Sequence, residues 1–262
     1  MGVVHEVSRL RTYGFSPLSL RSLPVMEIQK TCGGIRLSQH GVVISEVRLK
    51  PGPTHSVFDV LAGLIAILRP QASVGVLGFA AGGMLAPLRN LGCDVRVDGV
   101  DLDPVSYDVF QKHCSSWAGD LCWEQADAVA WLGRRRGRYS VLVDDLSVPM
   151  SGDVFKPDVS WEVIPTLMRR RLGAGGVAIF NCLPGPDGRI PSVFAERVAS
   201  LGPVLVILMD DFENKVVMAG AGMPSARWVG KELRSALRRI GSLQSDRVQV
   251  RSGIQAAGIA DG

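Results

Sequence analysis

The sequence is poor in the residues that build metal sites and disulfide frameworks. Its 262 residues include only five cysteines and four histidines. The cysteine count is odd, no Cys-x-x-Cys occurs, and the histidines lack the paired spacing of metal ligands. We therefore expect reduced, mostly buried thiols, as in a cytoplasmic protein, and no metal site.

The sequence also has few aromatic residues, no long apolar run and only a small net charge. Aromatics make up 6% of the chain and the net charge is +4. No apolar run approaches the ~18 residues that cross a bilayer, so we expect no membrane association. The arginine clusters at 134–138 and 169–171 lack interleaved aromatic residues for base stacking. They indicate solvated helix ends, and we expect no nucleic-acid partner.

The chain does have the length and apolar content for one α/β domain with additions, since 47% of its residues are hydrophobic. Residues 1–30 show no helical or strand periodicity of apolar residues, and we expect a poorly ordered extension there. It is either a targeting segment or the result of a start codon assigned upstream of the natural one. Residues 31–53 hold two β-like runs around a Gln-His-Gly turn, which predicts a hairpin. Residues 54–222 alternate strand and helix patterns. Residues 223–262 form a basic helix and a tail that we expect to be frayed.

The most informative stretch is 74–83, Val-Gly-Val-Leu-Gly-Phe-Ala-Ala-Gly-Gly. Its apolar start predicts a buried strand, and its glycines predict a tight turn before a helix. Such a turn lets a ligand approach bare backbone and the positive end of a helix. Taken alone, the same turn is equally well explained as a compact connection.

Acidic residues follow the later strands of this pattern. About twenty residues beyond the turn, a second strand ends at Asp101, where a βαβ nucleoside site places the carboxylate that binds ribose hydroxyls. Asp103, before a proline, predicts a helix N-cap. Asp127 fits either a helix cap or a ligand. A fourth strand ends in Asp144 and Asp145.

Strands that alternate with helices predict a doubly wound, Rossmann-like sheet, here of seven strands. The runs at 203–209 and 215–219 are joined by too few residues for a parallel crossover, so the last strand is expected to be antiparallel. Ligands of such sheets bind outside the carboxyl ends of the strands, which is where the turn and the acidic residues fall.

Four motifs, in this order, resemble those of the class I S-adenosylmethionine-dependent transferases. They are Val-Leu-Gly-Phe-Ala-Ala-Gly-Gly, Val-Asp-Leu-Asp-Pro, Ala-Asp-Ala and Val-Leu-Val-Asp-Asp. Their arrangement is most similar to the spermidine synthase branch, in which a hairpin and a helix precede the core. The resemblance covers residues 33–220 and implies S-adenosylmethionine, or its decarboxylated form, as the cofactor.

The resemblance also implies a role for each motif. The glycine-rich turn flanks the amino-acid or aminopropyl arm of the cofactor, Asp101 accepts hydrogen bonds from the ribose, and Asp127 accepts one from adenine. Asp144 corresponds to the acid that faces the attacking amine in the aminopropyltransferases, and Asp144 and the adjacent Asp145 are the candidate catalytic residues. The implied cofactor-binding residues are Gly78, Ala80, Gly82, Gly83, Asp101, Leu102, Asp127 and Ala128.

The sequence departs from the spermidine synthase pattern at several of these positions. Ala80 and Ala81 replace a glycine and an acid, and the second acid of the Asp-Ser-Ser-Asp-Pro loop is missing. A diamine carries two cations that need several carboxylates. We therefore favour methyl transfer to a small-molecule amine or hydroxyl.

Three alternatives remain open at this point. One is polyamine aminopropyl transfer. The second is a nicotinamide-dependent oxidoreductase, although no Tyr-x-x-x-Lys is present. The third is a non-catalytic nucleoside-binding protein that has kept only the fold. The expected partner is a small-molecule acceptor, and a homodimer is left open.

Overall fold

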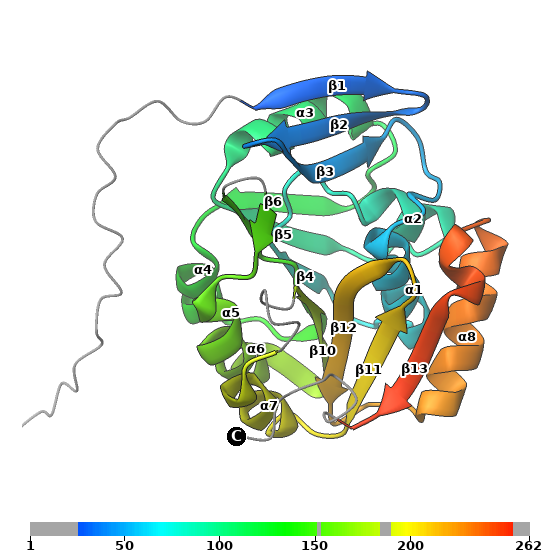
Figure 1. Ribbon diagram of the computed structural model, residues 1–262. Coiled ribbons are helices and arrows are strands. Elements are labelled where there is room, and N and C mark those ends of the chain that lie inside the picture. The colour runs from blue at the N-terminus through cyan, green and yellow to red at the C-terminus, as the bar shows by residue number, and fades with distance from the viewer. Residues whose placement is uncertain (1–25, 151–152, 184–189, 254–262) are drawn as a thin grey trace, which may run out of the picture.

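The computed structural model describes residues 26–150, 153–183 and 190–253 (Figure 1). The strands are β1 (Glu27–Thr31), β2 (Gly34–Gln39), β3 (Val42–Arg48), β4 (Val74–Leu77), β5 (Val97–Asp101), β6 (Leu121–Gln125), β7 (Tyr139–Asp144), β8 (Val148–Met150), β9 (Asp153–Phe155), β10 (Leu172–Cys182), β11 (Val204–Met209), β12 (Phe212–Gly220) and β13 (Val248–Ser252). The helices are α1 (Val57–Leu68), α2 (Leu85–Asn90), α3 (Pro104–Cys114), α4 (Ala128–Arg134), α5 (Asp158–Glu162), α6 (Ile164–Arg171), α7 (Ser192–Ala199), α8 (Ala226–Arg239) and the 3-10 turn η1 (Leu243–Asp246).

The main sheet has eight strands in the order β13-β11-β12-β10-β7-β4-β5-β6. The five strands from β10 to β6 are parallel to one another, while β12 runs antiparallel to both β10 and β11. The predicted doubly wound sheet with an antiparallel strand near its end is therefore confirmed.

The eighth strand, β13, corrects the expected count of seven, and it corrects the expectation of a frayed tail for residues 248–252; residues 254–262 lie outside the described residues. It pairs antiparallel with β11 from Val248 to Ser252. Val248 is buried and Val250 packs against the core. The five-residue pattern is too short to identify a strand by itself, and its hydrogen-bond partner β11 lies about forty residues earlier in the chain.

The apolar side chains of the parallel strands alternate between two cores. On β7, Val141 and Val143 belong to one core and Leu142 to the other. Helices α1, α2 and α8 cover the first face, and α4 to α7 cover the second, as Figure 1 shows. Both faces of the central strands β4, β7 and β10 are thus buried, which is why their sequences contain continuous apolar runs.

A small antiparallel sheet, β1-β2-β3, precedes the main domain and lies at the top of Figure 1. The predicted hairpin corresponds to β2 and β3, whereas β1 lies mostly within residues 1–30, where we expected no order. Its side chains are largely exposed, so it has no apolar period to reveal it. Leu37 and Val47 anchor the small sheet on the main core.

The chain order of the strands reverses beside β4, which places β5 on one side of it and β7 on the other. The turn after β4 and the loop after β7 therefore meet at the carboxyl edge of the sheet, where doubly wound folds bind ligands. In the described part of the chain, none of the helices combines the length and the apolar character of a membrane span.

Candidate functional site: a cleft at the carboxyl edge of the sheet

A cavity of about 580 Å³ opens at the carboxyl ends of β4, β5 and β7. Residues that follow β4, β5, β6, β7 and β10 line it, together with residues from β2, β3, α1 and β12. The small sheet therefore contributes to the cavity lining. The sequence-predicted site residues that line the cavity are Gly78, Ala80, Gly83, Asp101, Leu102, Asp127, Ala128 and Asp145.

Gly78 lets two loops approach each other closely. Its φ is +79°, and a Cβ there would lie 2.7 Å from the carbonyl oxygen of Asp145. Only glycine accommodates both the left-handed backbone and this contact. The glycine is therefore required for the loop after β7 to close over the turn, in addition to leaving space on the cavity side.

Gly82 differs from Gly78, Ala80 and Gly83 because it does not line the cavity. It is buried, and a Cβ there would lie 2.7 Å from the ring of Phe79 and 3.2 Å from that of Phe110. Gly99 leaves room for the same Phe79 ring. The absence of a side chain at Gly82 therefore leaves room for the aromatic rings packed beneath the turn. Gly83, in contrast, lines the cavity beside Phe58.

Asp101 fixes the shape of the turn. Its Oδ2 accepts a 2.7 Å hydrogen bond from the Ala80 amide, and its Oδ1 accepts one of 3.0 Å from Asp103. Burial raises the pKa of Asp101, and these two bonds oppose the rise. Ala80 has a φ of +44°, unusual for a residue with a side chain, and this conformation aims its N–H at the carboxylate. A carboxylate beside a tight turn can also accept hydroxyl groups of a ligand.

Asp103 and Asp127 both act as helix caps. Asp103 accepts from the Val105 amide at 2.9 Å, and Asp127 accepts from the Ala130 amide at 2.8 Å. The capping interpretation of both residues is therefore confirmed. Asp127 also lines the cavity, so a ligand can still reach its other carboxylate oxygen.

The structure separates the two acids that end β7. Asp144 is fully buried and lies outside the cavity lining, with its Oδ1 3.1 Å from Lys156 Nζ and 3.2 Å from Ser160 Oγ. Asp145 lines the cavity instead. Successive side chains leave a strand in opposite directions, so only one of two adjacent acids can face the cleft.

Asp145 belongs to a chain of polar side chains along the cavity. Asn181 Nδ2 donates to its Oδ1 at 2.7 Å, and Asn214 Nδ2 donates to Asn181 Oδ1 at 3.0 Å. Burial raises the pKa of Asp145 to about 7, against the opposing effects of the Asn181 hydrogen bond and the Lys156 charge. A carboxyl group with this pKa can take up or release a proton near neutral pH.

Sequence reasoning missed Lys156 and Asn214. Lys156 lies in an irregular segment and Asn214 in a short, polar part of β12, so neither follows a recognisable motif. The weak signal for Lys156 was a single cation between a phenylalanine and a proline, close in sequence to the acids. Among the described residues, no group of three or more His, Cys, Asp or Glu side chains is placed to hold a metal ion.

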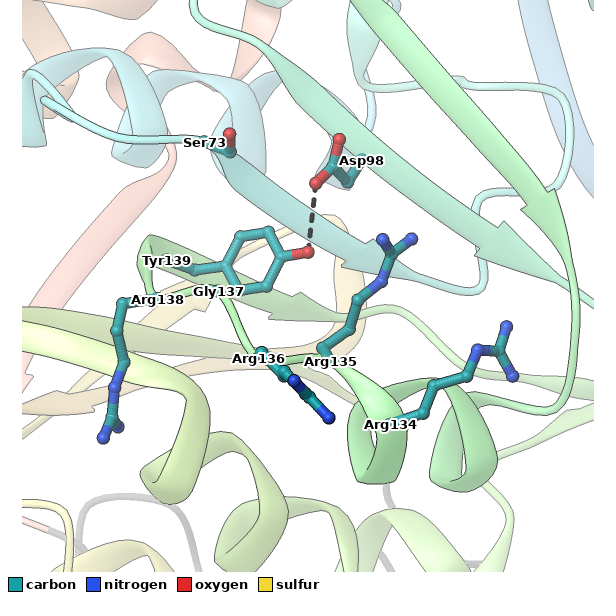
Figure 2. Close-up of a pocket in the computed structure, with 8 residues that line it drawn as sticks. All are labelled: Ser73, Asp98, Arg134, Arg135, Arg136, Gly137, Arg138 and Tyr139. Atoms are coloured by element: carbon teal, nitrogen blue, oxygen red, sulfur yellow. Dashed lines mark hydrogen bonds between the residues drawn. The ribbon is translucent and has the colours of Figure 1, made fainter.

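A second cavity, of about 360 Å³, lies at the opposite edge of the sheet beside Ser73 and the arginine-rich loop before β7. Figure 2 shows Tyr139 Oη directed at Asp98, to which it donates at 3.0 Å. Arg96 Nε donates to the other oxygen of Asp98 at 2.9 Å. The arginine side chains in Figure 2 spread apart instead of converging. We therefore take the cavity at the carboxyl edge as the candidate site.

Comparison with solved structures agrees with this architecture. A probable spermidine synthase from Corynebacterium glutamicum is similar with a TM-score of 0.69 and 16% identity, over 91% of each chain. The chain has the fold of the class I S-adenosylmethionine-dependent transferases. The fold that the four motifs implied is therefore confirmed.

Two other solved structures share this transferase fold. Spermidine synthase from Thermotoga maritima has a TM-score of 0.58 and 11% identity, over 84% of this chain and 75% of that one. Human methyltransferase-like protein 13 in complex with SAH has a TM-score of 0.54 and 16% identity, over 70% of this chain and 90% of that one. No protein-family model and no curated protein matches the sequence.

Proposed function

We propose that this protein is an S-adenosylmethionine-dependent transferase that methylates a small-molecule acceptor. The observation that carries the proposal is the position of Asp101, which lines the same cavity as Gly78 and Asp145 and is hydrogen-bonded to the turn through Ala80. The human methyltransferase with this fold was solved in complex with SAH. A turn with bare backbone and a neighbouring acid are the features that an adenosine-containing cofactor requires.

The proposed cofactor contacts follow the lining of the cavity. Gly78, Ala80 and Gly83 border the amino-acid arm, Asp101 accepts from the ribose hydroxyls, and Asp127 accepts from the adenine amino group. Leu102 and Ala128 border the base. We assign no direct contact to Gly82, because it packs against Phe79.

When bound, the cofactor supplies a carbon that is activated by its sulfonium leaving group. The protein then has to align the acceptor with that carbon and exclude water, which alone accelerates such transfers substantially. The small sheet and β12 form the wall that would exclude water. Asp145 is the proposed proton acceptor because it faces the cavity, whereas Asp144 is paired inside the protein.

Aminopropyl transfer from decarboxylated S-adenosylmethionine is the second candidate. It is favoured by the likeness to a probable spermidine synthase over 91% of both chains. The burial of Asp144 against Lys156 weighs against it, because that acid would have to face the amine. A non-catalytic nucleoside-binding role is the third possibility, and a lack of turnover with every acceptor would favour it.

Calorimetric titration with S-adenosylmethionine, its decarboxylated form and NAD tests the proposal. We expect S-adenosylmethionine to bind, and Asp101→Ala to weaken binding by at least about tenfold, through loss of one charge-assisted contact. The matched control is Asp108→Ala, an exposed acid on α3. Selective binding of the decarboxylated form would support aminopropyl transfer, and selective binding of NAD would refute a sulfonium cofactor.

A further inference from the structure

Two arginine clusters that are separate in the sequence lie side by side at the amino edge of the sheet, where the parallel strands begin. One cluster follows α4 and leads into β7, and the other ends α6 and leads into β10. Tyr139 of β7 pairs with Leu172 of β10, so the residues just before these two positions are neighbours. We call the following seven residues the arginine surface: Arg134, Arg135, Arg136, Arg138, Arg169, Arg170 and Arg171.

Hydrogen bonds between the two segments hold this arrangement. Arg171 Nε donates to the Leu132 carbonyl oxygen at 2.7 Å, and Arg171 Nη2 donates to that of Gly133 at 2.8 Å. In the other direction, Arg138 Nη1 donates to the Leu172 carbonyl oxygen at 3.2 Å. A carbonyl oxygen carries no net charge, and a guanidinium group is always protonated in proteins. These bonds therefore fix the two arginines without neutralising them.

The arginine surface carries more positive charge than its surroundings neutralise. Glu124 forms ion pairs with Arg134 and Arg135, and it is the only carboxylate that pairs with the seven arginines within the described parts of the chain. The carboxyl-terminal ends of α4 and α6 contribute about half a negative charge each. Of the seven positive charges, about five are therefore left without compensation.

The arginine surface is also open to solvent and lacks apolar side chains. Its exposed members are Arg134, Arg136, Arg138, Arg169 and Arg170. None of the exposed large hydrophobic residues of the described chain belongs to α4, to α6 or to residues 135–138, and Trp131 of α4 is fully buried. Protein interfaces have an apolar, aromatic-rich centre, and helices that bind membranes insert apolar side chains. The surface fits neither kind of partner.

The side chains of the arginine surface do not converge on one point. Figure 2 shows Arg134, Arg136 and Arg138 extending in different directions around the second cavity. A small anion needs several donors directed at one position, whereas a long polyanion needs donors spread along its length. The phosphate groups of a nucleic-acid duplex form such a polyanion. Guanidinium groups, in addition, can bind two oxygens of one phosphate at once.

The expectation of no nucleic-acid partner rests on the lack of aromatic residues for base stacking. Contacts with the phosphate backbone depend on charge instead, and they supply nearly all of sequence-independent binding. In the sequence, each arginine cluster is short enough to be explained as a solvated helix end. Only the folded chain joins the two clusters into one surface.

We propose that the arginine surface binds the phosphate backbone of double-stranded nucleic acid, without preference for base sequence. The lack of exposed aromatic side chains favours a duplex over a single strand, because single strands are held by base stacking. The surface lies at the opposite edge from the cavity of the proposed transferase, so binding at one edge does not depend on binding at the other.

Fluorescence anisotropy of short labelled duplexes of mixed sequence, in RNA and DNA versions, measures this binding with the full-length protein. We expect a dissociation constant between about 1 and 100 μM at physiological salt, the range of sequence-independent binding. With three to five phosphate contacts, the affinity should fall by about 40- to 500-fold between 50 and 200 mM salt.

A triple variant, Arg136→Gln with Arg169→Gln and Arg170→Gln, tests the location of the binding surface. All three side chains are exposed, so the fold should persist. We expect the affinity for either duplex to fall by at least about tenfold at low salt. The slope of log affinity against log salt should become shallower by about 2–3. Lysine at the same three positions keeps the charge and should retain the affinity within about threefold, which separates loss of charge from loss of fold.

The matched control combines Arg227→Gln, Lys231→Gln and Arg251→Gln, which removes three exposed charges from α8 and β13. Helix α8 covers the other face of the sheet (Figure 1), so this control should bind duplexes as the wild-type protein does. Titration with S-adenosylmethionine should give the same result for the glutamine variant of the arginine surface and for the wild-type protein, because none of the substituted residues lines the carboxyl-edge cavity.

Absence of duplex binding by the wild-type protein overturns the proposal, and so does an equal loss of affinity in the control variant. Binding of polyglutamate, or of phosphatidylserine-containing vesicles, as tightly as the duplexes also overturns it, because either result would assign the surface to a protein or a membrane. A preference for RNA or for DNA supports the proposal and identifies the nucleic acid. If the wild-type protein binds duplexes but not S-adenosylmethionine, only the proposed transferase function fails.

Discussion

Asp145 combines a cavity position with a pKa of about 7, and both properties come from its surroundings. Burial disfavours its charged form, while Asn181 and Lys156 favour it. Asp144, its neighbour in the chain, lies with Lys156 in the interior. Two adjacent and chemically identical side chains therefore have different roles, because the strand sends them to opposite sides.

The raised pKa of Asp145 predicts a decline in stability with pH. Between pH 4 and pH 7 the folded protein retains a proton that the unfolded chain has already released, so the free energy of unfolding falls as the pH rises. One proton limits the slope to about 1.4 kcal/mol per pH unit. Asp145→Asn should remove this contribution, and urea titrations of both proteins at several pH values would measure it. Equal slopes in the two proteins would contradict the assignment.

At the scale of elements, the site depends on how closely the turn after β4 approaches the loop after β7. The Asp145 amide donates to the Leu77 carbonyl oxygen at 2.9 Å, and Gly78 faces the Asp145 backbone. The turn also donates to the end of β5, through the amides of Gly78 and Phe79. These contacts join three strand ends into one rigid base for a ligand.

Gly78→Ala should disrupt this base. The new methyl group would meet backbone atoms 2.7–2.9 Å away at a φ of +79°, so we expect a loss of at least about 2 kcal/mol in the free energy of unfolding. Gly133→Ala is the control, since no heavy atom lies within 4 Å of a Cβ there and α4 should gain up to about 1 kcal/mol. Urea denaturation of both variants makes the comparison. A similar stability for the two would refute the close approach.

For the whole molecule, the two edges of the sheet differ in character. The carboxyl edge carries an open cavity walled by several loops and the small sheet. The amino edge carries internally paired polar groups, with Tyr139 and Arg96 both donating to the buried Asp98. We therefore expect stability and ligand binding to respond independently to substitutions at the two edges.

Tyr139→Phe tests this independence. It leaves the buried Asp98 without its tyrosine donor, so the free energy of unfolding should fall by about 1–3 kcal/mol. The affinity for S-adenosylmethionine should stay the same, because the proposed cofactor cavity lies at the other edge. Tyr107→Phe, in a half-buried ring stacked on Trp123, should cost less. A parallel loss of cofactor affinity in Tyr139→Phe would mean that the two edges are coupled.

Local patterns were enough to identify the main sheet and the edge that carries the cavity. Short apolar runs located β4 and β7, and the spacing from the turn together with a final carboxylate located β5. The few residues between β11 and β12 required an antiparallel pair. The same local patterns predicted the glycine-rich turn and the acidic residues at the ends of the strands. β1 and β13 escaped prediction, because one has exposed side chains and the other depends on a distant partner for its hydrogen bonds.

The sequence by itself determined the layered α/β architecture, the glycine-rich turn and the position of Asp101, because each depends on the period and spacing of nearby residues. Only the tertiary structure decided which acid faces the cleft. That choice depends on Lys156, twelve residues after Asp144, and on Asn181, thirty-six residues after Asp145. Burial and charge pairing arise from the folded arrangement of distant segments, so no local pattern can encode them.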